Sequence, residues 1–407
     1  RLLTRKPYQN REVVLGVTGS IAAYKACEVA SQLVQAGVSV TPVLTHSACE
    51  LVCPATFEAI TGRRAITNMF ERLMNPEIEH IAVATRAHLF LIAPATANII
   101  AKAACGLADD WLSTTLLATR APILFAPAMN SNMYEHPATQ ANIRVLLERG
   151  CHFVGPESGR LACGTYGIGK LIDPNKIVDA ALSLLDPRND YQDIHVLITN
   201  GPTREPIDPV RFISNRSSGK MGSALAREAL ARKAKVTVVS GPVEEPLPFG
   251  AEVIPIETAE EMARAVEEYF PKCDVFLAAA AVADYRVEEQ WTIKQKKTGG
   301  PLPLKLVENP DVLGNVAKIK SASQVVVGFA AETHEIVENA RKKALSKGTD
   351  FILANVVGIA NSGFGAPTSQ AYWLDAEGNV EELGMLEKSE IAQHIFDRVR
   401  SFMNEKS

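Results

Sequence analysis

Short apolar runs alternate with amphipathic stretches along most of the chain. The apolar run 13–17 leads into the turn GVTGS, a helical pattern follows over 21–36, and Gly37 separates it from a second apolar run, 38–44. A strand, a helix and a second strand in this order form a βαβ unit, which predicts neighbouring parallel strands. The first half of the chain is therefore predicted to be a doubly wound α/β domain.

Three further apolar runs in this half each end in a polar turn. They are 89–93 before PATAN, 123–126 before PAMNSNM, and 153–154 before GPESG. Because the carboxyl ends of parallel strands meet at one edge of a sheet, we expect these turns to converge there, where doubly wound folds bind ligands. The turn 16–20 lacks the GxGxxG spacing, but its hydroxyl groups and the helix that follows suit the phosphate of a mononucleotide.

The second half repeats the pattern after a polar break. Residues 186–190, DPRND, are polar and contain a proline, which predicts a boundary between domains 1–187 and 188–407. Beyond it we expect strands at 194–198, 236–240, 275–279, 325–329 and 351–354, a hairpin over 372–383, and helices that begin at Gly219 or span 258–269, 335–345 and 389–402. The predicted fold class is α/β, with two Rossmann-like, mostly parallel sheets.

The loop that joins the first strand and the first helix of the second half is long and rich in cations. It contains Arg204, Arg211, Arg216 and Lys220 and leads into a helix N-terminus, where free backbone N–H groups and the helix dipole favour anions. A P-loop is excluded, because serine and methionine stand where that motif needs glycine and Ser/Thr. A nucleotide site of another kind is predicted.

Composition narrows the classes of function. The 42 basic and 46 acidic residues give a formal charge of -4, which argues against nucleic acid or an acidic membrane surface as a partner. Seven cysteines without a CxxC pair indicate a reducing compartment, and no apolar run has the length of a membrane span, so we expect a cytoplasmic protein. Because the chain begins at Arg1 rather than Met, a trimmed or processed N-terminus stays open.

Four segments of the first half carry a resemblance to a known family. GVTGSIAAYK, APATAN, APAMNSNM and the glycine-rich GRLACGTYGIGK resemble the flavin-containing cysteine decarboxylases, which implies a flavodoxin-like domain that binds FMN. By position, the matching catalytic residues are His80, Asn130 and Cys163. The resemblance also implies that Met129 contacts the substrate and that FMN contacts Gly19, Ser20, Thr45, Pro94, Ala95, Thr96 and Asn98.

The implied reaction is an oxidative decarboxylation in which FMN carries the electrons. A hydride would leave the Cβ atom of an acyl-cysteine, CO₂ would leave the resulting thioaldehyde, and the hydride would return. Cys163 would donate a proton, His80 would act as base or electrostatic partner, and Asn130 would hold the carboxylate. Structural interpretations stand beside these roles, since Asn130 could cap a helix and Cys163 could be a small buried apolar residue.

A second, independent set of motifs occupies the other half. ITNGPTREPIDPVRFISNRSSGKMG, AAVADY, KQKK before two glycines, NPD and GFAAET resemble phosphopantothenate–cysteine ligase. With the first half, the chain resembles over nearly its whole length the bifunctional phosphopantothenoylcysteine decarboxylase/phosphopantothenate–cysteine ligase family of coenzyme A biosynthesis. The implied ligase reaction couples 4′-phosphopantothenate to cysteine through an acyl-cytidylate, with CTP and Mg²⁺ or Mn²⁺.

The ligase resemblance assigns roles position by position. Asn215 would bind the acyl intermediate, Arg211 would support it or the pantothenate phosphate, and Asp284 would meet the nucleotide or its metal. Lys294 would stabilise the transferring phosphate, although the family's KIKK reads KQKK here, so Lys296 and Lys297 stay alternatives. The other positions implied to bind substrate or nucleotide are Pro310, Asp311, Phe329, Lys343 and Lys347. Asn200 stands where the family usually has Ala, which is expected to alter the packing of this loop.

Two other classes of function compete with this interpretation. A flavin-binding regulatory or interaction protein of the same fold would lack catalysis, but His80, Asn130 and Cys163 are all present. A flavin-prenylating enzyme would have no use for the ligase-like half. The expected partners are small-molecule substrates, and the resemblance implies a homo-oligomer with trimeric decarboxylase and dimeric ligase domains.

Overall fold

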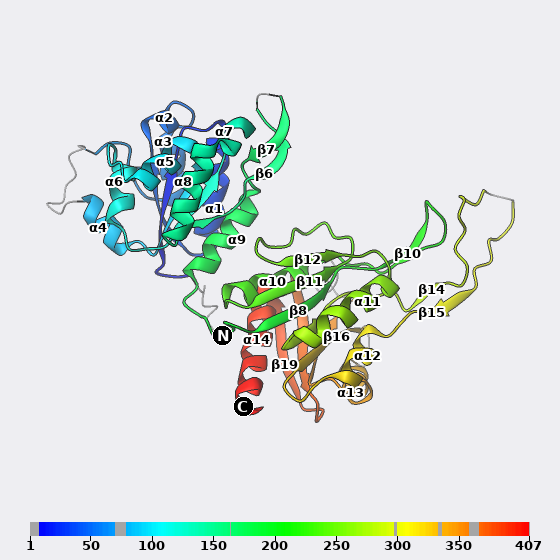
Figure 1. Cartoon of the computed structure of the whole chain (residues 1–407). Helices are drawn as coiled ribbons and strands as arrows, with labels where there is room; N and C mark the ends of the chain where they lie inside the picture. Colours follow the sequence, from blue (N-terminus) through cyan, green and yellow to red (C-terminus); the bar gives the residue numbers. More distant parts are fainter. Residues whose placement is uncertain are drawn as a thin grey trace. The chain divides into compact units, whose positions relative to one another are not determined.

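The computed structural model describes residues 8–69, 79–162, 164–296, 299–332, 336–357 and 366–406. The chain divides into two compact units, Arg1–Pro187 and Arg188–Ser407, and each is built around its own sheet (Figure 1). Among the described residues, no helix has both the length and the apolar character needed to cross a membrane.

The first unit is built on a parallel sheet of five strands in the order β2-β1-β3-β4-β5. This is the strand order of flavodoxin-like folds, in which the direction of winding reverses between β1 and β3. The predicted fold class of this half is therefore confirmed. The strands are β1 Glu12–Val17, β2 Ser39–Leu44, β3 Leu89–Ala95, β4 Ile123–Pro127 and β5 His152–Phe153.

Helices cover both faces of this sheet. Val13, Leu15 and Val17 pack in one core with α1, α3 and α9, whereas Val14 packs in a second core with α4, α5, α6 and α8. A strand buried on both faces reads as a continuous apolar run, which is why all of β3 is buried. The helices are α1 Ala26–Gln35, α2 His46–Cys49, α3 Pro54–Thr61, α4 Glu79–Arg86, α5 Ala97–Cys105, α6 Trp111–Ala118, α7 Ser131–Glu135, α8 Pro137–Glu148 and α9 Pro174–Leu185.

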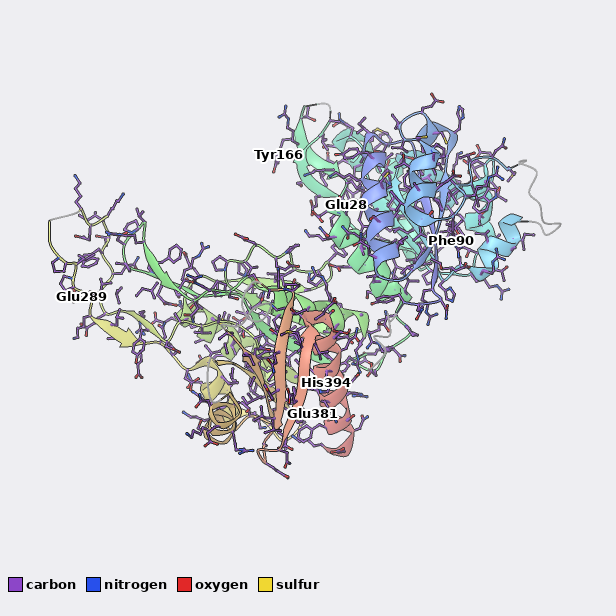
Figure 2. The ribbon with its side chains drawn as sticks, turned by 180° about the vertical axis from the view of Figure 1, so that it is seen from behind. Glu28, Phe90, Tyr166, Glu289, Glu381 and His394 are labelled. Carbon is purple, nitrogen blue, oxygen red and sulfur yellow. The ribbon has the colours of Figure 1, made fainter. Side chains whose placement is uncertain are left out.

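The helix predicted over 21–36 consists of two elements. A 3-10 helix, η1 Ile21–Lys25, precedes α1, and the Ser20 hydroxyl caps it by accepting a hydrogen bond from the Ala22 backbone N–H at 3.3 Å. A separate antiparallel hairpin of β6 Glu157–Arg160 and β7 Tyr166–Lys170 projects from the body of this unit, with Tyr166 on its outer part (Figure 2).

The second unit has eight strands in the order β12-β11-β8-β13-β16-β17-β18-β19. The first six are parallel and follow the order of the Rossmann fold, with the reversal of winding between β8 and β13. β18 and β19 run antiparallel at one edge and form the predicted hairpin. The other six strands are parallel, so the sheet is mostly parallel, as expected. The strands are β8 His195–Asn200, β11 Lys235–Ser240, β12 Glu252–Pro255, β13 Val275–Ala278, β16 Val325–Glu332, β17 Phe351–Val356, β18 Thr368–Asp375 and β19 Val380–Glu387.

The helices of this unit also form two layers. α10 and α14 pack in one core against β8, β11 and β13, while α11 and α12 pack on the opposite face. On the first face, Glu381 of β19 lies 3.8 Å from His394 of α14 (Figure 2). The helices are α10 Lys220–Ala231, α11 Ala259–Tyr269, η2 Phe270–Lys272, α12 Val312–Ile319, α13 Ile336–Lys347 and α14 Lys388–Lys406.

Two short ribbons complete the second unit. β9 Arg204–Pro206 pairs with β10 Phe212–Ser214, and β14 Tyr285–Val287 pairs with β15 Leu306–Glu308. Both pairs are antiparallel, and β14, β15 and the residues around Glu289 extend away from the main sheet of this unit (Figures 1 and 2).

A buried arginine ties the beginning of the second unit to its last helix. Arg232 is 3% exposed and pairs with Asp190, with Asp397 at 2.6 Å and with Glu228 at 3.6 Å. Burial opposes its charge, but the hydrogen bonds to Asp190 and Asp397 outweigh that cost and raise the pKa of Arg232.

Candidate functional site

A cavity of about 610 Å³ lies at the carboxyl edge of the first sheet. It is lined by the turn after β1, by Thr96 after β3, by the loop after β4 and by the β6–β7 hairpin. These segments meet where the winding of the sheet reverses, which is the usual ligand site of such folds. Three of the four turns predicted to converge line this cavity, whereas residues 155–159 do not, although Arg160 directly after them does.

Hydrogen bonds between loops hold this edge together. The Thr18 hydroxyl donates to the Pro94 carbonyl at 2.6 Å and accepts from the Thr96 backbone N–H at 3.1 Å. Thr18 is 2% exposed, so its hydroxyl serves the protein rather than a phosphate. Thr96 in turn caps α5, and its side chain accepts from the Ile99 backbone N–H at 3.4 Å.

The hairpin is seated on the loop after β4 through a backbone contact. The Met129 N–H donates to the Gly169 carbonyl at 2.9 Å. Gly169 has φ +129°, and a Cβ atom there would lie 2.3 Å from the Met129 carbonyl oxygen. Only glycine fits such a close approach. Gly169 therefore allows the hairpin to lie directly beside Met129 and Asn130.

Asn130 has a structural role and also lines the cavity. It is the N-cap of α7, where its side-chain oxygen accepts from the Asn132 backbone N–H at 2.9 Å, and it lies in the cavity wall. The next residue, Ser131, has a buried hydroxyl without a hydrogen-bond partner in the described part of the chain. The capping interpretation and the ligand interpretation of Asn130 are therefore compatible.

The lining of this cavity fits a flavin nucleotide. Ile21, Met129, Met133 and Leu171 offer apolar surface to a ring system, as cofactor sites usually do. Hydroxyl groups of Ser20 and Thr96 and the cations Lys25, Arg160 and Lys170 suit the ribityl chain and the phosphate. Tyr24 and these three cations were not among the predicted site residues, and no spacing rule singles them out.

The predicted residues of the first half are distributed as follows. Gly19, Ser20, Thr96, Met129 and Asn130 line the cavity. Thr45 caps α2 by accepting from the Ala48 backbone N–H at 3.3 Å, Pro94 and Ala95 are buried in β3, and Asn98 is an exposed residue of the first turn of α5. His80 belongs to α4, but its side chain lies outside the described part of the structure, as does Cys163. These assignments stay predictions.

A cavity of about 640 Å³ lies at the carboxyl edge of the second sheet. The loops after β8 and β13 are joined there: the Thr199 hydroxyl accepts from the Ala280 N–H at 3.3 Å, the Thr203 hydroxyl accepts from the Ala283 N–H at 3.0 Å, and the Ala281 N–H donates to the Gly201 carbonyl at 2.9 Å. This edge is again the point where the winding reverses.

Asn215 is positioned on this edge by the AAVADY segment. Its side-chain nitrogen donates to the Val282 carbonyl at 2.9 Å and lies 3.5 Å from the Ala281 carbonyl. Asn215 also lines the cavity. Because the protein uses the amide nitrogen, the amide oxygen is left, among the described contacts, to meet a ligand.

Charged side chains of both signs line the second cavity. Asp284, Glu308 and Asp311 supply carboxylates, and Lys220, Lys347 and Lys388 supply cations. Lys347 pairs directly with Asp311, whose other oxygen accepts from the Gly314 N–H at 3.0 Å at the start of α12. Among the described residues, no cluster of three His, Cys, Asp or Glu could hold a metal by itself.

Other predicted residues of the second half lie in or outside this cavity. Pro310 and Phe329 line it together with Asn215, Asp284, Asp311 and Lys347. Arg211 and Lys294 are exposed and do not line it. Lys343 lies on α13, but its side chain, like all of Lys297, is outside the described residues, and Lys296 is exposed.

Arg211 joins the two ribbons of the second unit. Its guanidinium contacts Asp208 at 2.5 Å and donates to the Gln295 carbonyl at 2.9 Å. The Arg211 guanidinium, together with backbone N–H groups of Val210, Gln295 and Arg211, holds the pKa of Asp208 well below its usual range. Of the remaining loop cations, Arg204 and Arg216 line a neighbouring cavity of about 480 Å³.

Asn200, the departure from the family pattern, lies under the start of α10. It is 1% exposed, and its side-chain nitrogen donates to the Ser240 hydroxyl at 3.3 Å. A Cβ atom on Gly222 would lie 2.2 Å from the Asn200 side-chain oxygen, so the larger side chain is accommodated because residue 222 is glycine. Among the described residues, this oxygen has no hydrogen-bond partner.

Several cavity residues were missed by the sequence analysis. Ser217 and Ser218 precede α10, and Asn355 lies in β17 near its end. These residues lie in a polar loop or near the carboxyl end of a strand, and that position could have indicated that they line the ligand site. Ser369 lies in β18 and Lys388 begins α14, and no local pattern connects them with this cavity.

Comparisons with known proteins match the two units of the chain to two different family models. The Flavoprotein family model matches residues 2–186, and the DNA/pantothenate metabolism flavoprotein C-terminal domain model matches residues 191–403. The chain is 44% identical over 393 residues, 96% of its length, to coenzyme A biosynthesis bifunctional protein CoaBC of Bacillus subtilis (strain 168), of which 97% is covered. It is 40% identical to the CoaBC protein of Escherichia coli (strain K12), with 98% of each chain covered.

Similar solved structures cover single units. One is the C-terminal domain of a CoaBC protein, with 34% sequence identity and a TM-score of 0.46, covering 53% of this chain and 99% of that one. Another is the FMN-dependent cysteine decarboxylase SpaF, with 33% identity and a TM-score of 0.38, covering 43% of this chain and 99% of that one.

Proposed function

The chain belongs to the family of bifunctional coenzyme A biosynthesis proteins, and from this premise we propose how its two units divide the two reactions. The protein is a bifunctional flavoprotein enzyme with phosphopantothenoylcysteine synthetase and decarboxylase activities. We propose that unit 188–407 joins 4′-phosphopantothenate to cysteine. We propose that unit 1–187 then decarboxylates the product to 4′-phosphopantetheine.

The ligase proposal rests on the cavity at the edge of the second sheet, which brings an oriented amide and several cations together. The substrate carboxylate would attack the α-phosphate of CTP, pyrophosphate would leave, and the amine of cysteine would then displace CMP. The Asn215 amide oxygen would meet the acyl intermediate, because the Val282 and Ala281 carbonyls hold the amide nitrogen. Asp284 would bind Mg²⁺ with the phosphates, and Phe329 would contact cytosine or ribose.

Arg211 and Lys294 lie outside the cavity and would have to approach it to perform their proposed roles. Both are exposed: Arg211 lies between β9 and β10, Lys294 lies between β14 and β15, and the bond from Arg211 to the Gln295 carbonyl connects these two segments. We propose that these ribbons move toward the cavity when substrate is bound, so that Lys294 meets the transferring phosphate. Such closure excludes water from the reacting phosphates.

The decarboxylase proposal rests on the hairpin seated over the first cavity. When bound, FMN supplies reversible two-electron oxidation of the substrate thiol side chain. Asn130 would orient the substrate carboxylate, Cys163, which falls in the sequence between β6 and β7, would donate a proton, and His80 would assist proton transfer. Ser20, Thr96 and the nearby cations would hold the cofactor.

The family also suggests how copies of the chain associate. Ile21, Tyr24, Met133 and Tyr166 border the first cavity or lie on its hairpin, and they are 65%, 64%, 49% and 81% exposed. We propose that this apolar surface is covered in a trimer of the first unit, with the second unit forming dimers. Because the six described cysteines are all free, we propose a reducing compartment, the cytoplasm.

A product assay tests both halves together. Purified protein is incubated with 4′-phosphopantothenate, cysteine and Mg²⁺, with CTP or ATP in parallel, and products are identified by mass spectrometry. We expect phosphopantetheine with CTP. Phosphopantothenoylcysteine accumulating alone would contradict the decarboxylase assignment. No product with either nucleotide, in protein that retains FMN, would favour a regulatory flavoprotein instead.

A further inference from the structure

Two lysines from distant parts of the second unit meet in its cavity. Lys220 is the first residue of α10 and Lys388 is the first residue of α14, and both line the cavity of about 640 Å³. The two helices pack in the same core on one face of the sheet, with Leu225 of α10 and Ile391 of α14 among its members. Helix packing therefore fixes both lysines at the carboxyl edge of the sheet.

Lys388 is an unusual lysine because it is buried beside a like charge. Only 9% of it is exposed. Burial and the positive charge of Lys220 lower the pKa of Lys388 to about 8, against an opposing effect of Glu245. Glu245 lies in the segment after β11 and also pairs with Arg227 at 3.4 Å, while the cavity residues contributed by β17 and β18, Asn355 and Ser369, are neutral.

The rest of this end of the cavity is also suited to an anion. Ser217, Ser218 and Gly219 precede α10 and line the cavity, so hydroxyl groups and the free N–H groups at the start of a 12-residue helix meet there. An anion that reaches both lysines meets two positive charges in a partly desolvated place, where charge-assisted hydrogen bonds are strong.

We propose that Lys388, acting together with Lys220, binds the terminal phosphates of a nucleoside triphosphate in the second cavity. The inference rests on the proposed binding of a nucleotide in this cavity and adds Lys388 to the residues that contact the nucleotide. In the proposed reaction, the bond between the α-phosphorus and its bridging oxygen breaks, and the β- and γ-phosphates leave as pyrophosphate. Lys388 and Lys220 neutralise the charge of that leaving group, so Lys388 distinguishes a triphosphate from a monophosphate.

The test compares the binding of CTP and CMP by the full-length holoenzyme. Calorimetric titrations with Mg²⁺ are made for the wild type, Lys388→Met, Lys388→Arg and the control Lys235→Met, because Lys235 is exposed at the opposite edge of the sheet. Lys388→Met should bind CTP about 10- to 100-fold more weakly, as expected for the loss of a charged hydrogen bond. Its affinity for CMP and that of the control for both ligands should change less than about twofold.

Proton uptake provides a second readout that a structural role would not affect. At pH 8, Lys388 in the empty cavity is partly neutral, and phosphate beside it favours the protonated form. Titrations in HEPES and Tris should therefore reveal uptake of up to about half a proton when wild-type protein binds CTP. Lys388→Arg should retain CTP affinity but lose the uptake, because arginine stays charged.

Each outcome separates this inference from the proposed function. If Lys388→Met and the wild type bind CTP equally well, the proposed role of Lys388 is wrong, but the nucleotide role of the cavity is not affected. The same holds if Lys388→Met binds CTP and CMP more weakly by the same factor. If Lys388→Met does not fold, the proton-uptake titrations of the wild type and Lys388→Arg still test the proposal. Absence of proton uptake when the wild type binds CTP overturns it. Failure of the wild type to bind either CTP or CMP would overturn the nucleotide role of the cavity, and the inference with it.

Discussion

The two units place their cavities at equivalent positions and line them with different side chains. In the first unit the winding reverses between β1 and β3, and in the second between β8 and β13. The first cavity has apolar walls from Ile21, Met129 and Met133 and is bordered by a hairpin of its own unit. The second has carboxylates and lysines and receives Lys388 from the start of α14.

This difference follows the chemistry of the expected ligands. A flavin ring is mostly apolar and performs the electron transfer itself, so the protein has to position it and handle protons. A triphosphate carries several negative charges, and its reaction depends on cations that neutralise them. One sheet edge can therefore serve both reactions, because loops rather than strands supply the chemistry.

Replacing Cys163 tests whether the two sites act separately. Cys163→Ser should lower phosphopantetheine formation by about 10²- to 10⁴-fold, because serine is a much weaker proton donor than cysteine, while an ene-thiol intermediate accumulates and FMN stays bound. Ligase activity should not change. Mass spectrometry and the flavin absorbance spectrum measure both effects, with Cys105→Ser, an exposed cysteine, as the matched control. Wild-type turnover would remove the assigned role of Cys163.

Replacing Asn215 makes the reciprocal test on the second cavity. Asn215→Asp introduces a negative charge next to the Val282 and Ala281 carbonyls, which the side chain contacts, and it repels the phosphates. Phosphopantothenoylcysteine synthesis should fall about 10²- to 10³-fold, as for other removed transition-state contacts. Decarboxylation of supplied phosphopantothenoylcysteine should stay unchanged. A parallel loss of both reactions would mean that the sites are not independent.

Replacing Gly169 tests how the hairpin is held in the first unit. In Gly169→Ala, the new Cβ atom would collide with the Met129 carbonyl oxygen at 2.3 Å, and backbone strain of about 1–3 kcal/mol should displace the hairpin. Decarboxylation should slow by about 5- to 150-fold, with synthesis intact. Gly62→Ala also has a positive φ, +67°, but no atom within 4 Å of the new Cβ atom, so it reports the effect of a positive φ without a collision. Equal effects of the two variants would argue against the collision.

Replacing Arg232 should change the stability of one unit only. Arg232→Met leaves Asp190 and Asp397 without their buried partner, but both carboxylates reach solvent, so the loss should be about 2 kcal/mol rather than the larger cost of a fully buried pair. Urea unfolding followed by circular dichroism should show the second unit weakened and flavin release from the first unit unchanged. Arg398→Met removes an exposed pair with Glu381 and should cost less than about 1 kcal/mol.

Local patterns in the sequence were sufficient for most elements and for the family. Continuous apolar runs became strands buried on both faces. The Thr258 hydroxyl caps α11, and the Thr258 backbone N–H donates to the Glu261 side chain in return. Caps and periodicity are predictable because they depend on residues close in the chain. The helix expected over 21–36 was only partly right. The 3-10 turn η1 depends on how the chain leaves β1, which apolar spacing does not encode.

The sequence by itself determined that two parallel α/β units exist, which loops reach their ligand edges, and which motifs those loops carry. Tertiary structure alone decided that Gly169 seats the hairpin on Met129, that Arg211 is paired with Asp208 outside the cavity, and that Lys388 enters the cavity beside Lys220. Periodicity and capping act within a few residues, whereas the surroundings of a charged side chain are set by whichever distant segments pack against it.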